Sequence, residues 1–315
     1  MNVLLILFGC GATSASAPQV SPAPTPTHAP VSAAASAPQS EPLPAAGSAP
    51  AALPQAGAPD TFSLVFVGDW GTSNREERVV AQSISRWCHT ASCDAGALLG
   101  DNFYPEGVAS VDDPLWTTAW LNMYDPLGLV WHPALGNHDH LGNPAAQVEY
   151  SARSKTWAMP AQTYVWHGGP VDFFVIDSDV FDMPQARWLD EQLAASTAAW
   201  KVVYGHHPVY SNGYHGNNDA LKNMLLPVLV KNHVQLYLAG HDHDKQVLKT
   251  SDPVGWIIVG TGAEVRPTLS GANTVYASSR PGFGYLRFTS SEARLQLVAA
   301  NDDVEFETTF PRQSP

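Results

Sequence analysis

The sequence predicts an α/β fold built from two packed sheets with helices on their outer faces. In the first two thirds of residues 61–315, apolar runs of strand length alternate with segments of helical periodicity, which is the pattern of parallel βαβ units. In the last third, short runs show the two-residue alternation of antiparallel strands. Parallel units followed by antiparallel strands favour two sheets covered by helices.

The first 60 residues differ in composition from the rest and are excluded from the predicted core. Residues 1–10 (MNVLLILFGC) form an apolar run that is too short to span a bilayer and is typical of an export signal. Residues 11–60 are dominated by Ala, Pro and Ser, with Glu41 as the only charge before Asp60. This composition predicts an extended tether, because it buries too little apolar surface to offset its ordering entropy. Residues 61–315 are predicted to form a single domain.

Three segments of this domain carry the apolar spacing of amphipathic helices. The first is 74–87, the second is 184–195 with Pro184 at its start, and the third is 221–230, where Pro227 could limit the helix. Four runs near the end alternate as strands do. They are VGWIIVGTG (254–262), FGYLRFT (283–289), ARLQLVA (293–299) and VEFETTF (304–310).

Charge and cysteine content restrict the class of protein. A formal net charge of −13 and a pI of about 5.2 exclude a nucleic-acid binder, which would need a basic stripe, and leave small substrates open. Cys88 and Cys93, in WCHTASC, are the only cysteines after Cys10. In an exported protein this pair favours a local disulfide, and the alternatives are a redox or zinc site and two buried thiols.

Five apolar runs end in a glycine that is followed by a polar side chain. They are SLVFVGDW, GALLGDNFY, HPALGNHDH, VVYGHHP and LYLAGHDH. Ligand sites of open α/β sheets lie at the carboxyl ends of strands, and glycine permits a sharp turn there. In extended backbone, His241 and His243 would point to the same side and converge on one point. A single run of this kind would be interpreted as a strand followed by a polar loop. Five such runs, each followed by Asp, Asn or His, indicate a metal site.

These motifs, in the order GDWG, GDNFY, GNHDH, GHHP and GHDH, resemble the metallophosphoesterase superfamily. More closely, they resemble its purple acid phosphatases of the small tartrate-resistant type, from about Phe62 to about Gly262. The resemblance implies a four-layer αββα sandwich of two packed mixed sheets. It also implies an acid phosphatase that hydrolyses phosphate monoesters by metal-activated hydroxide. The alternatives are a phosphodiesterase or nucleotidase, and a surface lipoprotein that binds phosphate or iron with little turnover.

The resemblance assigns a binuclear centre of Fe(III) and a divalent Fe, Zn or Mn. In most metallophosphoesterases the first motif is Asp-x-His, whereas Gly71 stands at the third position of this motif here. Tyr104 supplies a phenolate instead, which is a hard ligand suited to ferric iron. The implied ferric ligands are Asp69, Tyr104 and His243. The implied ligands of the divalent ion are Asn137, His206 and His241, and Asp101 bridges both ions.

The remaining polar residues of the motifs receive separate interpretations. An isolated histidine is usually solvated, or buried with a hydrogen-bond partner. His138 and His215 are interpreted as catalytic candidates instead, because they lie within the motifs. His215 is the preferred proton donor to the leaving group. His207 is interpreted as pocket wall and His140 as a partner that orients a ligand. Further residues stay undecided between support of the site and solvent exposure or core packing. They are Asp139, Asp242, Asp244, Trp70, Phe103 and Tyr210.

Two other segments carry expectations about substrate and location. GTGAEVRPTLSG departs from the mammalian-type pattern, so Glu264 and Arg266 are candidates for reshaping the substrate entrance. Leu7, Phe8, Gly9 and Cys10 resemble a bacterial lipobox, which implies an exported protein anchored by lipid at Cys10 and facing the periplasm or the cell surface. The expected partners are small phosphorylated substrates and, through this anchor alone, a membrane. A monomer is expected.

Overall fold

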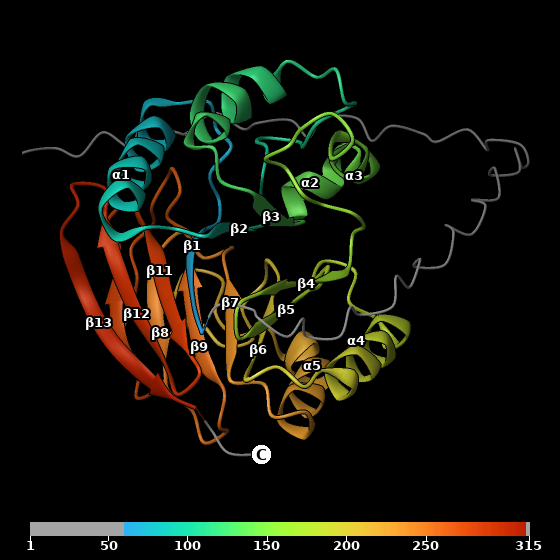
Figure 1. The fold of residues 1–315 in the computed structure, drawn as a ribbon, viewed down its shortest axis with the longest axis vertical. Coiled ribbons are helices and arrows are strands. Elements are labelled where there is room, and N and C mark those ends of the chain that lie inside the picture. The colour runs from blue at the N-terminus through green and yellow to red at the C-terminus, as the bar shows by residue number, and fades with distance from the viewer. Residues whose placement is uncertain (1–59, 313–315) are drawn as a thin grey trace, which may run out of the picture. The chain divides into compact units, whose positions relative to one another are not determined.

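Two mixed β-sheets form the centre of the structure, a computed structural model that describes residues 60–312 (Figure 1). The first sheet has the order β13-β12-β11-β1-β2-β3, with β1, β2 and β3 parallel and the remaining pairs antiparallel. Its strands are β1 (Thr61–Val67), β2 (Ala95–Leu99), β3 (Trp131–Ala134), β11 (Gly282–Thr289), β12 (Glu292–Ala299) and β13 (Val304–Pro311).

The second sheet has the order β10-β8-β9-β7-β6-β5-β4, in which β9, β7, β6 and β5 are parallel neighbours. Antiparallel strands complete both edges. Its strands are β4 (Tyr164–Gly168), β5 (Val171–Val175), β6 (Trp200–Tyr204), β7 (Leu236–Ala239), β8 (Lys245–Leu248), β9 (Gly255–Val259) and β10 (Thr274–Ser278). The predicted fold class, two packed mixed sheets with flanking helices, is confirmed.

The three predicted helices are present and begin at side-chain caps. Asn74 accepts a hydrogen bond from the Glu77 amide at the start of α1, and Asn218 does the same for α5. The expectation that Pro227 limits α5 is wrong, because the helix continues to Lys231. Pro227 lies on the exposed side of the helix, where the backbone carbonyl that loses its hydrogen-bond donor can face solvent. The helices are α1 (Arg75–Ala91), η1 (Trp116–Tyr124), η2 (Asp125–Leu127), α2 (Asn137–Leu141), α3 (Pro144–Tyr150), α4 (Met183–Ala195) and α5 (Asp219–Lys231).

The central strands of the second sheet are buried on both faces. In β5 and β6, Phe173 and Val202 belong to the core shared with the first sheet, whereas Phe174 and Val203 belong to the core shared with α4 and α5. Successive strand residues point to opposite faces, so the continuous apolar runs of these strands fill two cores at once. Helices α4 and α5 lie side by side over the outer face of this sheet (Figure 1).

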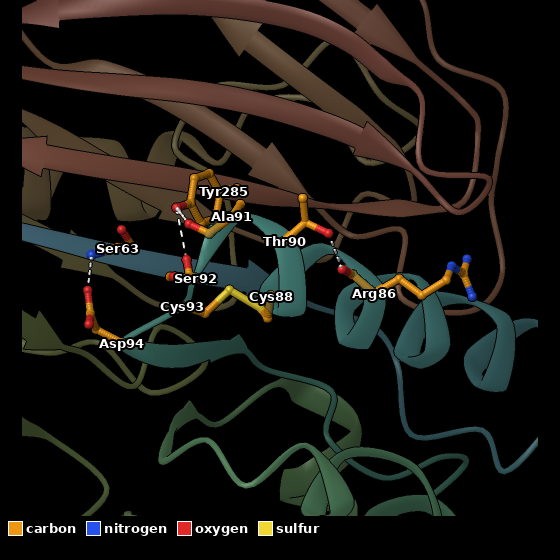
Figure 2. Close-up of a disulfide and its surroundings, with 9 residues drawn as sticks. All are labelled: Ser63, Arg86, Cys88, Thr90, Ala91, Ser92, Cys93, Asp94 and Tyr285. Carbon is orange, nitrogen blue, oxygen red and sulfur yellow. Dashed lines mark hydrogen bonds between the residues drawn. A yellow bond between two sulfur atoms is a disulfide. The ribbon is translucent and has the colours of Figure 1, made fainter.

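The predicted disulfide joins Cys88 at the end of α1 to Cys93, five residues later (Figure 2). Two hydrogen bonds hold the turn around it to the first sheet. Tyr285 of β11 donates its hydroxyl to the carbonyl of Ser92 at 2.9 Å, and the Ser63 amide of β1 donates to Asp94 at 2.7 Å. The disulfide therefore closes a turn whose other contacts already position β2 beside β1.

The predicted signal segment (1–10) and tether (11–60) lie outside the described residues, except for Asp60. Within residues 60–312, no helix is long and apolar enough to cross a membrane.

Candidate metal centre

The site lies where five strands end. Asp69 follows β1, Asp101 follows β2, Asn137 opens α2 after β3, and His206 and His241 follow β6 and β7. Backbone hydrogen bonds join the sheets at this edge. The Gly68 amide after β1 donates to the carbonyl of Val259 in β9 at 2.8 Å, and the Gly262 amide after β9 donates to the carbonyl of Gly68 at 3.0 Å. The strand ends of both sheets therefore bring the predicted ligands to one place.

Tyr104 is the centre of one group of side chains. Its hydroxyl oxygen lies 2.9 Å from Asp101 Oδ2, 3.2 Å from Asp69 Oδ1 and 3.3 Å from His243 Nε2. His243 Nε2 is also 3.4 Å from Asp69 Oδ1. The three predicted ferric ligands and Asp101 thus converge on one point.

His206 is the centre of a second group, which shares Asp101 with the first. Its Nε2 lies 3.1 Å from Asn137 Oδ1, 3.1 Å from His241 Nδ1 and 3.3 Å from Asp101 Oδ2. A ligand atom from each of Asp69, Asp101 and His206, all three buried, lies within 4.8 Å of the others. The same oxygen of Asp101 faces both groups, which is the position a bridging carboxylate requires.

The chemistry of these groups fits a pair of cations. The Leu99 carbonyl can only accept, so the His206 Nδ1 2.9 Å away donates to it, and Nε2 is the atom that faces the centre and can bind a metal once its proton is displaced. Burial, followed by the carboxylates of Asp69 and Asp101, raises the pKa of Tyr104 well above its ordinary value. Burial lowers the pKa of His206, but the same carboxylates raise it to about 10. The site therefore attracts positive charge, and a metal would displace protons from it.

The backbone at the site is locally strained, because three proposed ligands have positive φ angles. These angles are 58° at Asp69, 49° at Asp101 and 67° at His241, in the left-handed region that non-glycine residues rarely adopt. Residues 241–244 therefore turn instead of continuing β7, and the expectation that His241 and His243 converge from an extended strand is wrong. His241 contacts the His206 group and His243 contacts the Tyr104 group.

Two glycines leave room for the carboxylates of Asp101 and Asp69. A Cβ atom on Gly136 would lie 2.2 Å from Asp101 Oδ1, and one on Gly240 would lie 2.5 Å from Asp69 Oδ2. Both distances are far inside van der Waals contact, so a side chain at either position would displace a proposed ligand. This close approach explains the glycine in the GNHDH and GHDH motifs.

Comparison with known proteins agrees with this geometry. Residues 62–245 match the model of the calcineurin-like phosphoesterases. The chain belongs to that family. The human tartrate-resistant acid phosphatase type 5 is 32% identical over 303 residues, which cover 82% of this chain and 93% of the human protein. Purple acid phosphatase 7 of Arabidopsis thaliana is 28% identical over 287 residues, which cover 81% of this chain and 87% of the plant protein.

A solved structure gives the same fold. GAP50, the anchor in the inner membrane complex of Plasmodium, superposes on the phosphoesterase with a TM-score of 0.73 and 21% identity, and the match covers 81% of this chain and 90% of that chain. A binuclear metal centre, iron plus a second metal, is what the purple acid phosphatase relatives imply for these converging ligands.

Asp139 joins two ligand-bearing loops of the phosphoesterase. Its buried carboxylate accepts hydrogen bonds from the amides of Asn102 at 3.0 Å, Phe103 at 3.2 Å and Gly136 at 2.9 Å, and from the Gln147 side chain at 2.8 Å. The loops after β2 and β3 are thereby held together. The sequence left open whether Asp139 supports the site or is exposed to solvent. In the structure it is buried and holds the two loops through hydrogen bonds.

His138 faces the centre beside Tyr104. Its amide donates to Asp101 Oδ1 at 2.9 Å, which orients the shared carboxylate. The Pro105 carbonyl can only accept, so the His138 Nδ1 2.5 Å away donates to it. Nε2 is left 4.0 Å from Asp101 Oδ2, and the imidazole lies 4.5 Å from the Tyr104 ring. His138 is therefore placed on the side of the proposed ferric ligands.

His215 lies on the opposite side, exposed and 4.1 Å from the ring of His241. Asp242 positions its backbone, because this buried carboxylate accepts the His215 amide at 2.9 Å and the Ser211 hydroxyl. Arg266 Nη1 lies 2.9 Å from His215 Nε2. A guanidinium only donates, so Nε2 accepts and the proton of a neutral His215 is on Nδ1.

His207 and His140 have different surroundings. The His207 ring lies 4.3 Å from that of His241 and lines a cavity of about 270 Å³ with His215, as expected for pocket wall. Burial lowers the pKa of His207 to about 3, so it is neutral. His140, the predicted orienting partner, pairs its Nε2 with Asp177 at 2.9 Å.

The aromatic residues of the motifs and Asp244 support the core. Trp70 and Phe103 are fully buried and pack edge to face, and Tyr210 packs against Trp256. Asp244 is buried and accepts a hydrogen bond from Gln246 at 2.9 Å. None of the four supplies a group to the centre.

Two cavities lie on either side of the centre. The cavity beside His215 and His241 has a volume of about 270 Å³, and one of about 310 Å³ is lined by Asp69, Tyr104, His243 and Glu264. A larger cavity of about 780 Å³ lies at the disulfide, lined by Cys88 and Cys93, and contains none of the proposed ligands. Substrate chemistry is therefore assigned to the two smaller cavities.

Proposed function

We propose that this phosphoesterase hydrolyses phosphate monoesters as an acid phosphatase with a binuclear metal centre. The observation that carries the proposal is the position of Asp101, whose Oδ2 lies 2.9 Å from the Tyr104 hydroxyl and 3.3 Å from His206 Nε2. One carboxylate shared by two groups of ligand atoms is the arrangement that holds two metals together. The relatives named acid phosphatases support the same reaction.

In this proposal, Asp69, Tyr104 and His243 hold Fe(III), and Asp101 bridges to a divalent Fe, Zn or Mn. The ligands of the divalent ion are Asn137, His206 and His241. Tyr104 favours ferric iron, because a hard phenolate oxygen suits a trivalent ion. Burial and the carboxylates of Asp69 and Asp101 oppose ionisation of the phenol, and a bound cation would offset the charge of the carboxylates. When bound, such a pair clamps the attacking and leaving oxygens of an in-line displacement and lowers the pKa of water.

The chain's own residues orient the centre and move the proton. His138 fixes the shared carboxylate through its amide, and Asp242 fixes the backbone of His215. The general acid is the protonated form of His215, which gives one proton to the leaving oxygen and returns to the neutral form, in which Nε2 accepts from Arg266. An alkoxide leaves poorly without such a proton, so His215 acts as the general acid and His138 is its competitor for this role.

Phosphate release by purified protein tests the reaction. We expect release from an aryl phosphate monoester and little or none from a bis-ester. A preference for the bis-ester would favour a phosphodiesterase, and preference for a nucleotide a nucleotidase. Absence of release from metal-replete protein would leave a binding protein and overturn the proposal.

The iron assignment has a spectroscopic test. We expect purified protein to contain iron and to absorb visible light through a tyrosinate-to-iron transition, and Tyr104→Phe should remove the absorption. Tyr124→Phe is a matched control, because Tyr124 is buried in the core and its hydroxyl has no hydrogen-bond partner among the described residues. Colourless, fully active protein that contains only divalent metals would contradict the assignment of Fe(III).

A further inference from the structure

The segment between β9 and β10 is fixed against the centre by its backbone. The Gly262 amide donates to Gly68 at 3.0 Å, the Arg266 amide donates to the carbonyl of the proposed ligand His243 at 2.8 Å, and the Leu269 amide donates to Asn212 at 3.2 Å. These bonds connect the segment to the end of β1, to a ligand and to the loop that carries His215. Its side chains therefore have defined positions at the substrate entrance.

Arg266 directs its charge to the His215 side of the centre. Its Nη1 donates to His215 at 2.9 Å, and its guanidinium carbon lies 5.4 Å from the centroid of the exposed Tyr214 ring. The described hydrogen bonds use one of its five N–H donors. Within residues 60–312, no carboxylate oxygen lies within 4.0 Å of this guanidinium. The half-buried guanidinium of Arg266 therefore lies beside the centre in a defined orientation, with N–H donors that can bind a ligand.

Glu264, two residues earlier, lies on the other side. It lines the cavity that also contains Asp69, Tyr104 and His243. The segment therefore presents a negative charge to one cavity and a positive charge toward the other. An anionic substituent on a substrate is disfavoured beside Glu264 and favoured beside Arg266.

We propose that Arg266 binds an anionic group on the leaving group of the substrate and selects for esters that carry one. The inference rests on the proposed function and adds a specificity-determining residue to it. One imidazole, that of His215, separates Arg266 from the proposed ligand His241, so the guanidinium lies beyond the scissile phosphate on the side of the proton donor. A planar guanidinium suits the paired oxygens of a carboxylate or a second phosphate.

Phosphoglycolate and its neutral amide, 2-phosphoglycolamide, test the carboxylate form of this inference. The two esters have the same shape, and both need a proton on the leaving oxygen, so a disturbance of His215 affects them alike. We expect wild-type kcat/KM to be about tenfold higher for phosphoglycolate, as one partly exposed charge-assisted hydrogen bond provides. Arg266→Gln should abolish this preference, and Arg266→Lys should retain part of it.

Arg287→Gln is the matched control, since Arg287 is exposed on β11 and should leave the preference unchanged. A preference that survives in Arg266→Gln, for an enzyme that hydrolyses both esters, overturns the inference and leaves the proposed function intact. Equal kcat/KM for both esters in the wild type also overturns the carboxylate form.

Calorimetric binding of methylenediphosphonate and methylphosphonate tests the phosphate form and does not need turnover. We expect Arg266→Gln to weaken methylenediphosphonate about tenfold while methylphosphonate binding stays the same. Unchanged binding of both in this variant overturns the phosphate form. If no ester is hydrolysed, the proposed function fails, and this measurement still decides whether Arg266 binds a second anionic group.

Discussion

At the scale of single residues, His215 is the proposed general acid, and its replacement should affect substrates according to their leaving groups. We predict that His215→Ala lowers turnover of an alkyl phosphate by about 10²–10⁴-fold and affects a nitrophenyl phosphate far less, because nitrophenolate leaves without a proton. Steady-state kinetics on both substrates measure the difference. Metal content should be unchanged, since His215 is exposed and 4.1 Å from the ring of His241, outside the ligand groups.

His89→Ala is the control for this variant, because His89 is exposed in the last turn of α1. Equal losses on both substrates would instead indicate that His215 positions phosphate. The same comparison in His138→Ala then identifies which of the two histidines gives up the proton.

Glu77 makes stability depend on pH. It is fully buried in α1, and burial raises its pKa from 4.5 to about 8, although hydrogen bonds from Ser73 and Thr72 oppose the shift. Between pH 4.5 and 8 the folded chain keeps a proton that the unfolded chain has lost, so the free energy of unfolding falls as pH rises.

We predict that this group contributes a decrease of at most about 1.4 kcal/mol per pH unit in that window. Glu77→Gln should remove this dependence, because the amide has no proton to lose. Urea unfolding of both proteins from pH 5 to pH 8 measures the two slopes. Glu76→Gln, at the exposed neighbouring position, should keep the wild-type slope. Parallel slopes for Glu77→Gln and wild type would contradict the prediction.

At the scale of elements, Asp139 is the residue that joins the loop after β2 to α2. Asp139→Ala would leave the buried amides of Asn102, Phe103 and Gly136 without their acceptor. We predict a loss of about 3–5 kcal/mol in the free energy of unfolding, together with lower metal content. Urea unfolding and elemental analysis measure both quantities.

Glu149→Ala, at an exposed position of α3, is the control for Asp139→Ala and should change stability by less than about 0.5 kcal/mol. Asp139→Ala protein that unfolds like the wild type and keeps its metal would show that water replaces the carboxylate.

The elements that the sequence predicted are those with strong local signals. Helices α1, α4 and α5 follow from 3.6-residue spacing and, for α4, from Pro184 at its start, and β9, β11, β12 and β13 follow from their apolar and alternating runs. The segment WTTAWLNMY, which forms η1, gave no prediction. Its π-helical turns depart from the spacing used to recognise an α-helix, and its rings are ordered by contacts with distant residues such as Trp70 and Trp157.

The residues of the site also divide into those that local sequence predicts and those that it does not. The seven predicted ligands lie together in the two groups around Tyr104 and His206, because each lies within a few residues of the end of a strand, which is local information. The roles of Asp139 and Arg266 could not be derived in this way. One depends on donors from three other segments, and the other depends on how a later loop lies against His215. Only the assembled sheets bring these partners together.

At the scale of the whole molecule, the N-terminal residues carry a prediction about location. We propose that lipid at Cys10 anchors the chain and that the Ala/Pro/Ser-rich residues after it separate the phosphoesterase domain from the membrane. Cys10→Ser should release the protein from the membrane fraction of bacterial cells without detergent. The Cys88→Ser/Cys93→Ser double variant should remain bound. Wild-type protein that is already free of the membrane fraction would contradict the anchor.

The strands that serve two cores also determine which parts of the molecule open last. A strand such as β6 or β7 cannot leave the sheet without exposing both the core between the sheets and the core under α4 and α5. Its amide hydrogens should therefore exchange with solvent only through global unfolding, whereas α4 and α5, which border one core, can open separately. His206 and His241 closely follow these two strands, so two of the three proposed ligands of the divalent ion are attached to the backbone that we expect to exchange most slowly.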